Sequence, residues 1–454
     1  MNYQRYESES GDILMVLTGE SLPSRKLSVF REEGFLKLRD LLHSGDFTFG
    51  NAECLFQNYE DTPNTLAGGG SPTGTYMATP SELIGELQWL GINIVSTANN
   101  HASDFGEAGV MTSLRYLDEG GMPHAGSGAN LTEARAPAYL DTPRGRLALL
   151  AAADWGPRGR GGSPWPFPMG VMAAEQSPYS KGRPGVNLVR HRMRFTVPGD
   201  VFRALQRMRD GLHFPGAHGG AGGTEAGQET EFTFMDCQIV LGNEFAMSTV
   251  AEQEDLEDNY RWVRDARRMA EWVLFSFHNH GATRSPELPS DAARVLAKGV
   301  IDNGADVFIG HGPHRDRGIE IYKGKPIFYG IGNLILQNDS IRWAPYEVMH
   351  RLGLGYDHTP ADFYEARTKT GFNSGIERWE TVVATCKWEK KEIKEIRLYP
   401  VDLGGGLPRS VNGRPVLAPV GSEVNQRVLR RFQDMSEPYG TKVLIDNGVG
   451  IICP

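Results

Sequence analysis

The chain has 454 residues, 40% of them hydrophobic and 23% charged, and a formal net charge of −9. This composition is typical of a folded globular protein and excludes a mainly disordered chain. The negative charge argues against nucleic acid or an anionic membrane surface as the main partner, because both bind through a broad basic surface.

The amino-terminal sequence lacks an apolar stretch of signal-peptide length, and no later stretch has the apolar length of a membrane-spanning helix. We therefore expect a cytoplasmic protein without a membrane partner. Its cysteines have no C-x-x-C spacing, which favours reduced structural thiols over disulfides or a thiolate zinc site. They are Cys54, Cys237, Cys386 and Cys453.

Strand-like and helix-like patterns alternate through the first half of the chain. Apolar runs of strand length alternate with segments whose leucines recur at helical spacing. This alternation predicts an α/β fold in which helices cover a sheet. The expected strands are Ile13 to Thr18, Phe47 to Phe49, Ile92 to Ala98 and Leu147 to Ala153; the expected helices contain Leu36 to Leu42, Leu83 to Leu90 and Met111 to Leu117.

The pattern breaks into glycine, proline and basic residues between about Asp154 and Glu257. We expect one domain over residues 1–454 with a loop-rich insertion at 155–257. A loop of this length is usually functional or irregular, so the insertion is either a lid or a surface excursion.

Periodic patterns resume after the insertion. Helices are expected at Trp262 to Met269, Ser290 to Asn303 and Val424 to Met435. Two strand-like runs, Trp379 to Cys386 and Ile393 to Tyr399, flank Glu389-Lys-Lys-Glu392 and predict a hairpin.

Metal-ligating side chains follow the predicted strands. The run Val307 to Ile309 is broken by glycine and proline where His311 and His314 occur. A histidine at the carboxyl end of such a strand can present a neutral nitrogen to a metal. Other strand ends offer Gly19-Glu20, Asn51-Ala-Glu53, Asn99-Asn-His101 with Asp104, and His278-Asn-His280.

All of these ligands are nitrogen or oxygen donors. They favour a divalent ion such as Mn, Fe or Zn over a thiolate zinc site.

These motifs, in this order, resemble the CapA family of poly-γ-glutamate biosynthesis proteins, whose fold is related to calcineurin-like metallophosphoesterases. The resemblance covers Gly11 to about Asp154 and Trp272 to about Pro400. It rests on Asn51-Ala-Glu53, Asn99-Asn-His-Ala-Ser-Asp104, His278-Asn-His280, Gly310-His-Gly-Pro-His314 and Tyr329-Gly-Ile-Gly-Asn333. It implies a metallophosphoesterase-like α/β/β/α sandwich with a metal site at the strand ends.

The resemblance also implies residue roles. Asn100 would bind metal and His101 would assist the leaving group. Glu20 stands where the related chains have aspartate, and its longer side chain can still bind a metal. The number of ions, one or two, stays open. The full set of metal ligands would be Glu20, Glu53, Asn100, His278, His311 and His314.

Residue types and spacing suggest further site residues. Asp104 lies three residues after His101 and would either orient that imidazole or cap a helix. His280 would be a second ligand or a substrate contact. Arg315 and Arg317 would bind an anionic substrate. We expect Asn333 either to contact substrate or to cap a turn, and Asn51 to bond its own loop.

The leading hypothesis is a metal-dependent hydrolase with His101 and Asp104 as catalytic residues. It would cleave an amide or ester bond in a small or peptide-like carboxylate-bearing substrate, such as a γ-glutamyl compound, through a metal-activated water. A metal-dependent phosphoesterase and a non-catalytic poly-γ-glutamate or capsule assembly protein are the alternatives. A homo-oligomer is compatible with all three.

Overall fold

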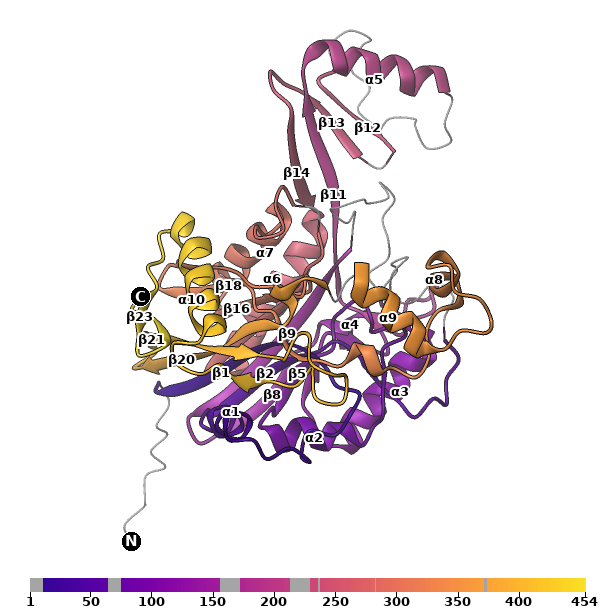
Figure 1. Ribbon diagram of the computed structural model, residues 1–454. Helices are drawn as coiled ribbons and strands as arrows, with labels where there is room; N and C mark the ends of the chain where they lie inside the picture. Colours follow the sequence, from indigo (N-terminus) through magenta and orange to yellow (C-terminus); the bar gives the residue numbers. More distant parts are fainter. Residues whose placement is uncertain are drawn as a thin grey trace.

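The computed structural model describes residues 11–63, 75–155, 172–212, 229–235, 237–281, 283–370 and 374–454. Two ten-stranded sheets dominate the described chain (Figure 1). The expected α/β class is confirmed.

The first sheet contains the amino-terminal strands together with the carboxy-terminal ones. Its order is β23 (Leu444–Asp446), β24 (Val449–Ile452), β21 (Glu392–Asp402), β20 (Glu380–Glu389), β1 (Ile13–Leu22), β2 (Phe47–Ala52), β5 (Ile94–Ser96) and β6 (His124–Ala125), with β19 (Asn333–Leu336) also paired to β1 and β22 (Val416–Leu417) to β21.

The second sheet is formed by the middle of the chain. Its order is β12 (Glu231–Phe234), β13 (Cys237–Leu241), β11 (Leu188–Val197), β9 (Gly145–Trp155), β15 (Trp272–His278), β16 (Val307–His311), β18 (Lys325–Gly330) and β17 (Arg317–Tyr322), with β14 (Ala246–Ala251) paired to β11 and β8 (Ala138–Thr142) to β9. Two short pairs, β3 (Leu55–Phe56) with β4 (Ala78–Thr79) and β7 (Ser127–Gly128) with β10 (Gly185–Val186), complete the described strands.

The two sheets pack face to face. Leu17 and Phe49 of the first sheet share one buried apolar cluster with Leu149, Leu274 and Ile309 of the second. Strand side chains alternate between the two faces of a sheet, so apolar side chains also lie on the outer face of each sheet and must be covered there.

Helices cover both outer faces. A second apolar cluster joins the first sheet to α1 (Glu33–His43), α2 (Leu83–Leu90) and α3 (Gly106–Glu119). A third joins the second sheet to α6 (Gln253–Met269) and α7 (Asp291–Asp302). The layers are therefore helix, sheet, sheet and helix.

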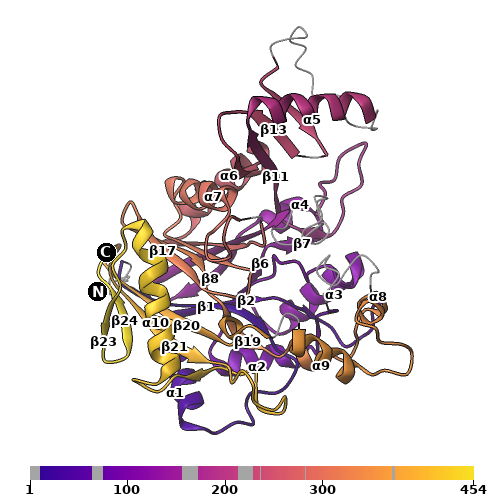
Figure 2. The same cartoon turned by 45° about the horizontal axis from the view of Figure 1, so that its top comes forward.

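The carboxy-terminal helix α10 (Glu423–Ser436) closes one edge between the sheets (Figure 2). Val428, Leu429 and Phe432 pack with Ile319 of β17 and Ile396 of β21, so the helix contacts both sheets. Its amphipathic pattern fits this position, because only one face is apolar.

Most elements predicted after the insertion are confirmed. The predicted hairpin is β20 and β21, which pair antiparallel around Lys390 and Lys391 in the left-handed backbone region. The predicted last helix is α10, and α7 matches the helix expected before His311. Helix α6 begins nine residues earlier than Trp262, at Gln253. Leu256 and Tyr260 extend its buried apolar face into these turns, where most other residues are polar.

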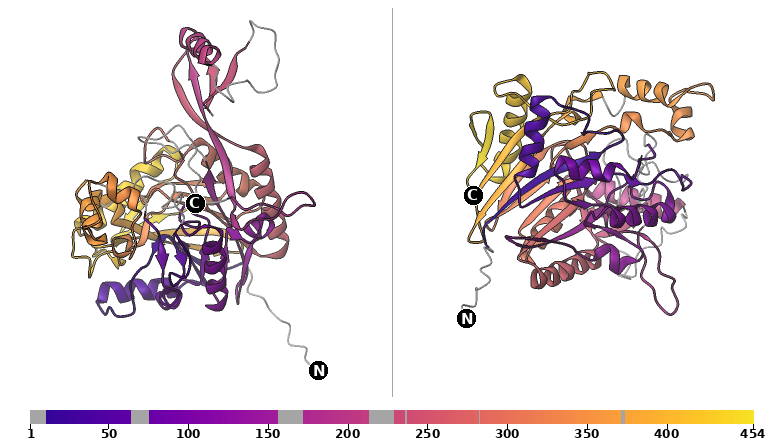
Figure 3. Two further views of the ribbon diagram at one scale, coloured as in Figure 1. Left: turned by 90° about the vertical axis from the view of Figure 1, so that its right-hand side faces the viewer. Right: turned by 90° about the horizontal axis from the view of Figure 1, so that it is seen from below.

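The predicted insertion at 155–257 contains regular structure where the structure describes it. Strand β11 leaves the second sheet and pairs beyond it with β13 and β14. Together with α5 (Gly199–Leu212) these strands form an arm that projects from the sandwich (Figure 3). The arm has a core of its own, which includes Phe202, Phe232 and Ile239. The glycine-rich runs at 156–162 and 216–223 lie outside the described residues, and a lid role stays a prediction.

Within the described ranges, no helix combines the length and apolarity needed to cross a bilayer. All four cysteines are free thiols, and only Cys453 is exposed.

Candidate metal centre

The candidate metal centre lies where parallel strands from both sheets end. β1 and β2 are parallel neighbours, with Glu20 opposite Asn51, and Glu53 follows directly after β2. β15 and β16 are also parallel, with His278 opposite His311. Because the carboxyl ends of parallel strands meet at one sheet edge, strand pairing brings Glu20 near Asn51 and His278 near His311. The packing of the two sheets then brings these two sets together.

A first ligand group consists of Glu20, His278 and His311, all buried. Their ligand atoms lie within 4.8 Å of one another, and the Nδ1 atoms of the two histidines are 3.0 Å apart. One carboxylate oxygen of Glu20 accepts a hydrogen bond from the Gly312 amide.

Glycine at position 312 is required by its surroundings. Its φ of 121° is left-handed, and a Cβ there would lie 2.8 Å from the Asn279 nitrogen.

A second ligand group consists of Glu53, His280 and His314. The Nε2 atom of His314 lies 3.5 Å from a Glu53 carboxylate oxygen. The groups are adjacent, since the Nε2 atoms of His278 and His280 are 3.1 Å apart. His314 has a φ of 54°, a left-handed conformation that is rare for a non-glycine residue and is often found at functional sites.

Neighbouring side chains orient the imidazoles. The Nδ1 atom of His314 lies 2.8 Å from Oδ1 of Asn333, whose Nδ2 donates to the Arg378 carbonyl. Since Asn333 presents its oxygen here, His314 donates from Nδ1 and keeps its Nε2 lone pair for the site. His311 is held by Ser276 Oγ, 2.6 Å from its Nε2.

Burial sets the protonation states. Desolvation lowers the pKa of His311 to about 3 and that of His278 and His314 well below the usual value. It also raises the pKa of Glu20 to about 8, against the lowering effect of the Gly312 amide. Neutral imidazole is the form that binds metal, so the histidines are in their ligating state.

His101 and Asp104 form a buried pair beside the ligands. Nδ1 of His101 lies 2.6 Å from Oδ2 of Asp104, which also accepts from the Met77 amide at 2.8 Å. The Nε2 atom of His101 lies 3.9 Å from Glu53. Helix α3 has Phe105 at its N-cap without a side-chain cap, so the capping alternative for Asp104 is not what the structure shows.

Three further residues predicted for the site, Asn100, Arg317 and Arg315, differ in their surroundings. Asn100 is at the centre, with Oδ1 2.6 Å from Nε2 of His278. Arg317 is 3% exposed, and burial lowers its pKa to about 10. Arg315 instead forms ion pairs with Glu287 and Glu377 at 3.4 and 2.7 Å.

Two residues, Asn51 and Ser276, contact the ligand histidines although the sequence analysis did not assign them to the site. The Nδ2 atom of Asn51 lies 3.3 Å from Nδ1 of His278, whereas a bond within its own loop was expected. Ser276 lies in β15 two residues before His278, so the period of the strand places both side chains on one face. That spacing could have identified Ser276; no local signal identifies Asn51, which contacts the other sheet.

The donor set fits a divalent cation. Among the described residues, Oε2 of Glu20 is buried and has no hydrogen-bond partner. A buried carboxylate oxygen is costly unless it is paired with a proton, a donor or a cation. Nitrogen and oxygen donors around it suit Mn, Fe or Zn.

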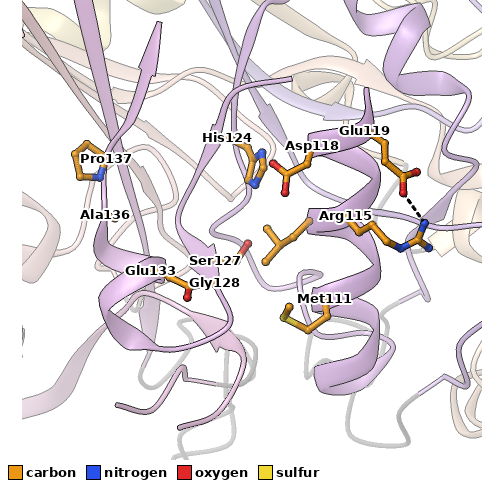
Figure 4. Close-up of a pocket in the computed structure, with 11 residues that line it drawn as sticks. Met111, Arg115, Asp118, Glu119, His124, Ser127, Gly128, Glu133, Ala136 and Pro137 are labelled. Atoms are coloured by element: carbon orange, nitrogen blue, oxygen red, sulfur yellow. Dashed lines mark hydrogen bonds and ion pairs between the residues drawn. The ribbon is translucent and has the colours of Figure 1, made fainter. Parts of the chain in front are cut away.

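A separate pocket of about 420 Å³ lies between α3 and the β7 region (Figure 4). His124 and Asp118 point into it, and Arg115 on its wall is paired with Glu119. Its lining residues do not include any member of the two ligand groups.

The fold and site together define an α/β protein with a candidate metal centre at the strand ends. The chain belongs to the bacterial capsule synthesis protein family PGA_cap, whose family model matches residues 9–338. This confirms the resemblance to CapA proteins.

Several known proteins are similar to the chain. An uncharacterized protein from Sinorhizobium fredii, y4sH, is 33% identical over 96% of this chain and 92% of its own length. The PGA biosynthesis protein CapA of Bacillus subtilis is 21% identical over 78% of this chain and 71% of its own length. A probable polyglutamine synthesis accessory protein of Mycobacterium tuberculosis is 25% identical over 54% of this chain and 45% of its own length.

Proposed function

We propose that this protein is a metal-dependent hydrolase that cleaves an amide or ester bond in a small carboxylate-bearing substrate, with γ-glutamyl compounds as the first candidates. The observation that supports this is the pair of adjacent glutamate and histidine ligand groups with the His101–Asp104 pair beside them. The name of the Bacillus subtilis relative, a PGA biosynthesis protein, supports a glutamate-containing substrate.

The metal would be held by Glu20, His278 and His311, by Glu53, His280 and His314, or by both groups. When bound, a divalent ion lowers the pKa of a coordinated water and polarises the bond to be cleaved. Asn100 contributes an amide oxygen next to His278.

The protein residues supply proton transfer and orientation. With Nδ1–H directed to Asp104, the His101 ring keeps Nε2 on the side of Glu53, where it can accept a proton or return one to a leaving group. Asp104 fixes the tautomer and stabilises the protonated ring.

Two other functions have specific support. A phosphoesterase would use the same ligands, and the resemblance to metallophosphoesterases favours it. The accessory-protein name of the Mycobacterium tuberculosis relative favours a non-catalytic role in polymer assembly.

Purified protein loaded with Mn or Zn should be assayed against γ-glutamyl amides, carboxylic esters and phosphodiesters. We expect hydrolysis of an amide or ester, lost in His311→Ala and retained in His358→Ala, an exposed histidine on a loop. Cleavage of phosphodiesters alone would assign the phosphoesterase function. Metal binding without cleavage of any substrate in the panel would favour the non-catalytic role.

A further inference from the structure

Glu20, a member of the first ligand group, lies at an irregular point of strand β1. The pairing of β1 with β19 shifts in register after Glu20, and its pairing with β2 shifts between Leu17 and Glu20. The regular ladder is therefore interrupted on both sides of this residue. Its amide donates to the Gly332 carbonyl at 3.2 Å, so the position of Gly332 helps to determine where the Glu20 backbone lies.

Gly332 is held in turn by the buried carboxylate of Asp316. Its amide donates to Oδ1 of Asp316 at 3.0 Å, and the same oxygen accepts from Oγ1 of Thr381 at 2.7 Å. The approach is close, since a Cβ on Gly332 would lie 3.3 Å from that oxygen. Asp316 is therefore linked to Glu20 through a single glycine.

The same carboxylate is also linked to the second ligand group. Asn333 comes directly after Gly332, and its Oδ1 lies 2.8 Å from Nδ1 of His314. Holding Gly332 against Asp316 therefore also holds the segment that orients His314. Glu20 and His314 belong to different ligand groups, so one side chain supports both.

Asp316 is paired with an arginine of the carboxy-terminal helix α10 (Figure 2). Nη2 of Arg431 donates to Oδ2 of Asp316 at 2.8 Å and to the Glu380 carbonyl at 3.2 Å. The Asp316 side chain is fully buried, and a buried carboxylate is costly unless it is paired. Helix α10 lies beyond residue 338, where the family match ends, and neither Asp316 nor Arg431 was singled out from the sequence.

We propose that Asp316 and Arg431 are positioning residues of the metal centre, which hold Glu20 and His314 in the arrangement that binds a divalent ion. The proposal rests on the proposed function for the metal, and it does not depend on which bond is cleaved. Side chains that orient metal ligands affect metal affinity without touching the ion, and their loss typically weakens binding about 10- to 100-fold.

A second arginine of α10 provides a matched control. Arg427 lies one helical turn before Arg431, and its Nε donates to the Glu380 carboxylate at 3.0 Å. That carboxylate is also buried, so Arg427→Gln breaks a comparable ion pair between α10 and the first sheet. It removes no hydrogen bond of Asp316 or Gly332. A loss of stability alone predicts the same effect from both arginine variants, whereas positioning predicts different effects.

The test uses Co²⁺ alone as the probe, because its visible absorption reports both binding and the arrangement of the ligands. The metal-free full chain is titrated in its parent form and as Asp316→Asn, Arg431→Gln, Arg431→Lys and Arg427→Gln. Unfolding by denaturant is measured for each variant, so that metal affinity and stability are compared separately.

We expect Arg431→Gln and Asp316→Asn to raise the Kd for Co²⁺ by roughly 10- to 100-fold and to change the absorption bands of the bound ion. Arg431→Lys should recover much of the affinity, because an ammonium group can supply the hydrogen bond that Nη2 donates to Asp316. The double variant should bind no more weakly than the weaker single variant, because the two residues act as one unit. Arg427→Gln should keep the parental Kd and bands while its free energy of unfolding falls.

An unchanged Kd and unchanged bands in Arg431→Gln would overturn the positioning role, and so would equal losses of affinity in Arg431→Gln and Arg427→Gln. A parent chain that binds no Co²⁺ would overturn it as well. Should the buried Asp316→Asn fail to fold, the two Arg431 variants decide.

The substrate panel, applied to the parent, separates the two proposals. Metal binding that depends on Arg431, without hydrolysis, retains the positioning role and rejects the hydrolase. Hydrolysis with metal binding that does not depend on Arg431 does the reverse.

Discussion

Replacing Asp104 by asparagine tests how His101 works. The two side chains are buried and 2.6 Å apart, so their hydrogen bond is charge-assisted when Asp104 is ionised. Such a bond contributes about 1.5–3 kcal/mol, or roughly 10- to 150-fold in rate if it acts in the transition state. Asparagine keeps an oxygen that can accept from the Met77 amide and can turn its NH₂ toward the ring, which would force the wrong tautomer.

The assay is a double-mutant cycle in kcat/KM with the best substrate from the panel. We expect His101→Gln to cost about 10²- to 10⁴-fold, the usual range for a general acid or base. Asp104→Asn should then have no further effect in the His101→Gln background. Metal content, measured in parallel, should match the wild type, because neither residue belongs to a ligand group.

If the losses of kcat/KM caused by Asp104→Asn and His101→Gln were additive in the double variant, this reasoning would be refuted. They would mean that Asp104 acts through its bond to the Met77 amide, as a structural residue of the loop, and not through the imidazole.

Further expectations concern metal, packing and pH. His311→Ala should lower the metal content found by elemental analysis and remove the thermal stabilisation by Mn or Zn, which is about 2.7 kcal/mol for an ion at 100 times its Kd. The Gly19→Ala variant should unfold at a lower denaturant concentration, because the new Cβ would lie 1.7 Å from the Gly332 carbonyl oxygen. As a control, Gly85→Ala in α2 has nothing within 4 Å of its new Cβ and should gain up to about 1 kcal/mol in the free energy of unfolding. Burial raises the pKa of Tyr260 to about 12, above its unfolded value of about 10. The unfolded chain therefore loses this proton first, stability falls between about pH 10 and pH 12, and Tyr260→Phe should reduce that loss in alkaline unfolding curves.

Much of the fold follows from local patterns in the sequence. Apolar runs ended by glycine placed His278 and His311 at strand ends, and β15 and β16 lie there as parallel neighbours. The hairpin of β20 and β21 followed from alternation around Lys390 and Lys391. These features depend on neighbouring residues, which the sequence displays directly.

The grouping of ligands could not be predicted in the same way. Glu20 meets His278 and His311 because the two sheets pack face to face, and that contact joins positions more than 250 residues apart. Asn51 was misjudged for the same reason, since its partner His278 lies in the opposite sheet.

Arg315 shows a further limit of sequence reasoning. Arg315 is adjacent to His314 in sequence, yet two glutamates pair with it. Tertiary packing, not chain proximity, decides which partners a guanidinium meets.

The position of β20 has a practical consequence for fragments of this protein. The family match stops at residue 338, whereas β20 pairs with β1 over Ile13 to Leu17. A polypeptide shortened to the matched region would leave one edge of β1 without its neighbour, although the side chains of Ile13 to Leu17 are all apolar and most of them are buried. Unpaired strand edges of this kind pair with other copies of the chain, so truncation is expected to yield insoluble aggregates in place of a smaller folded protein.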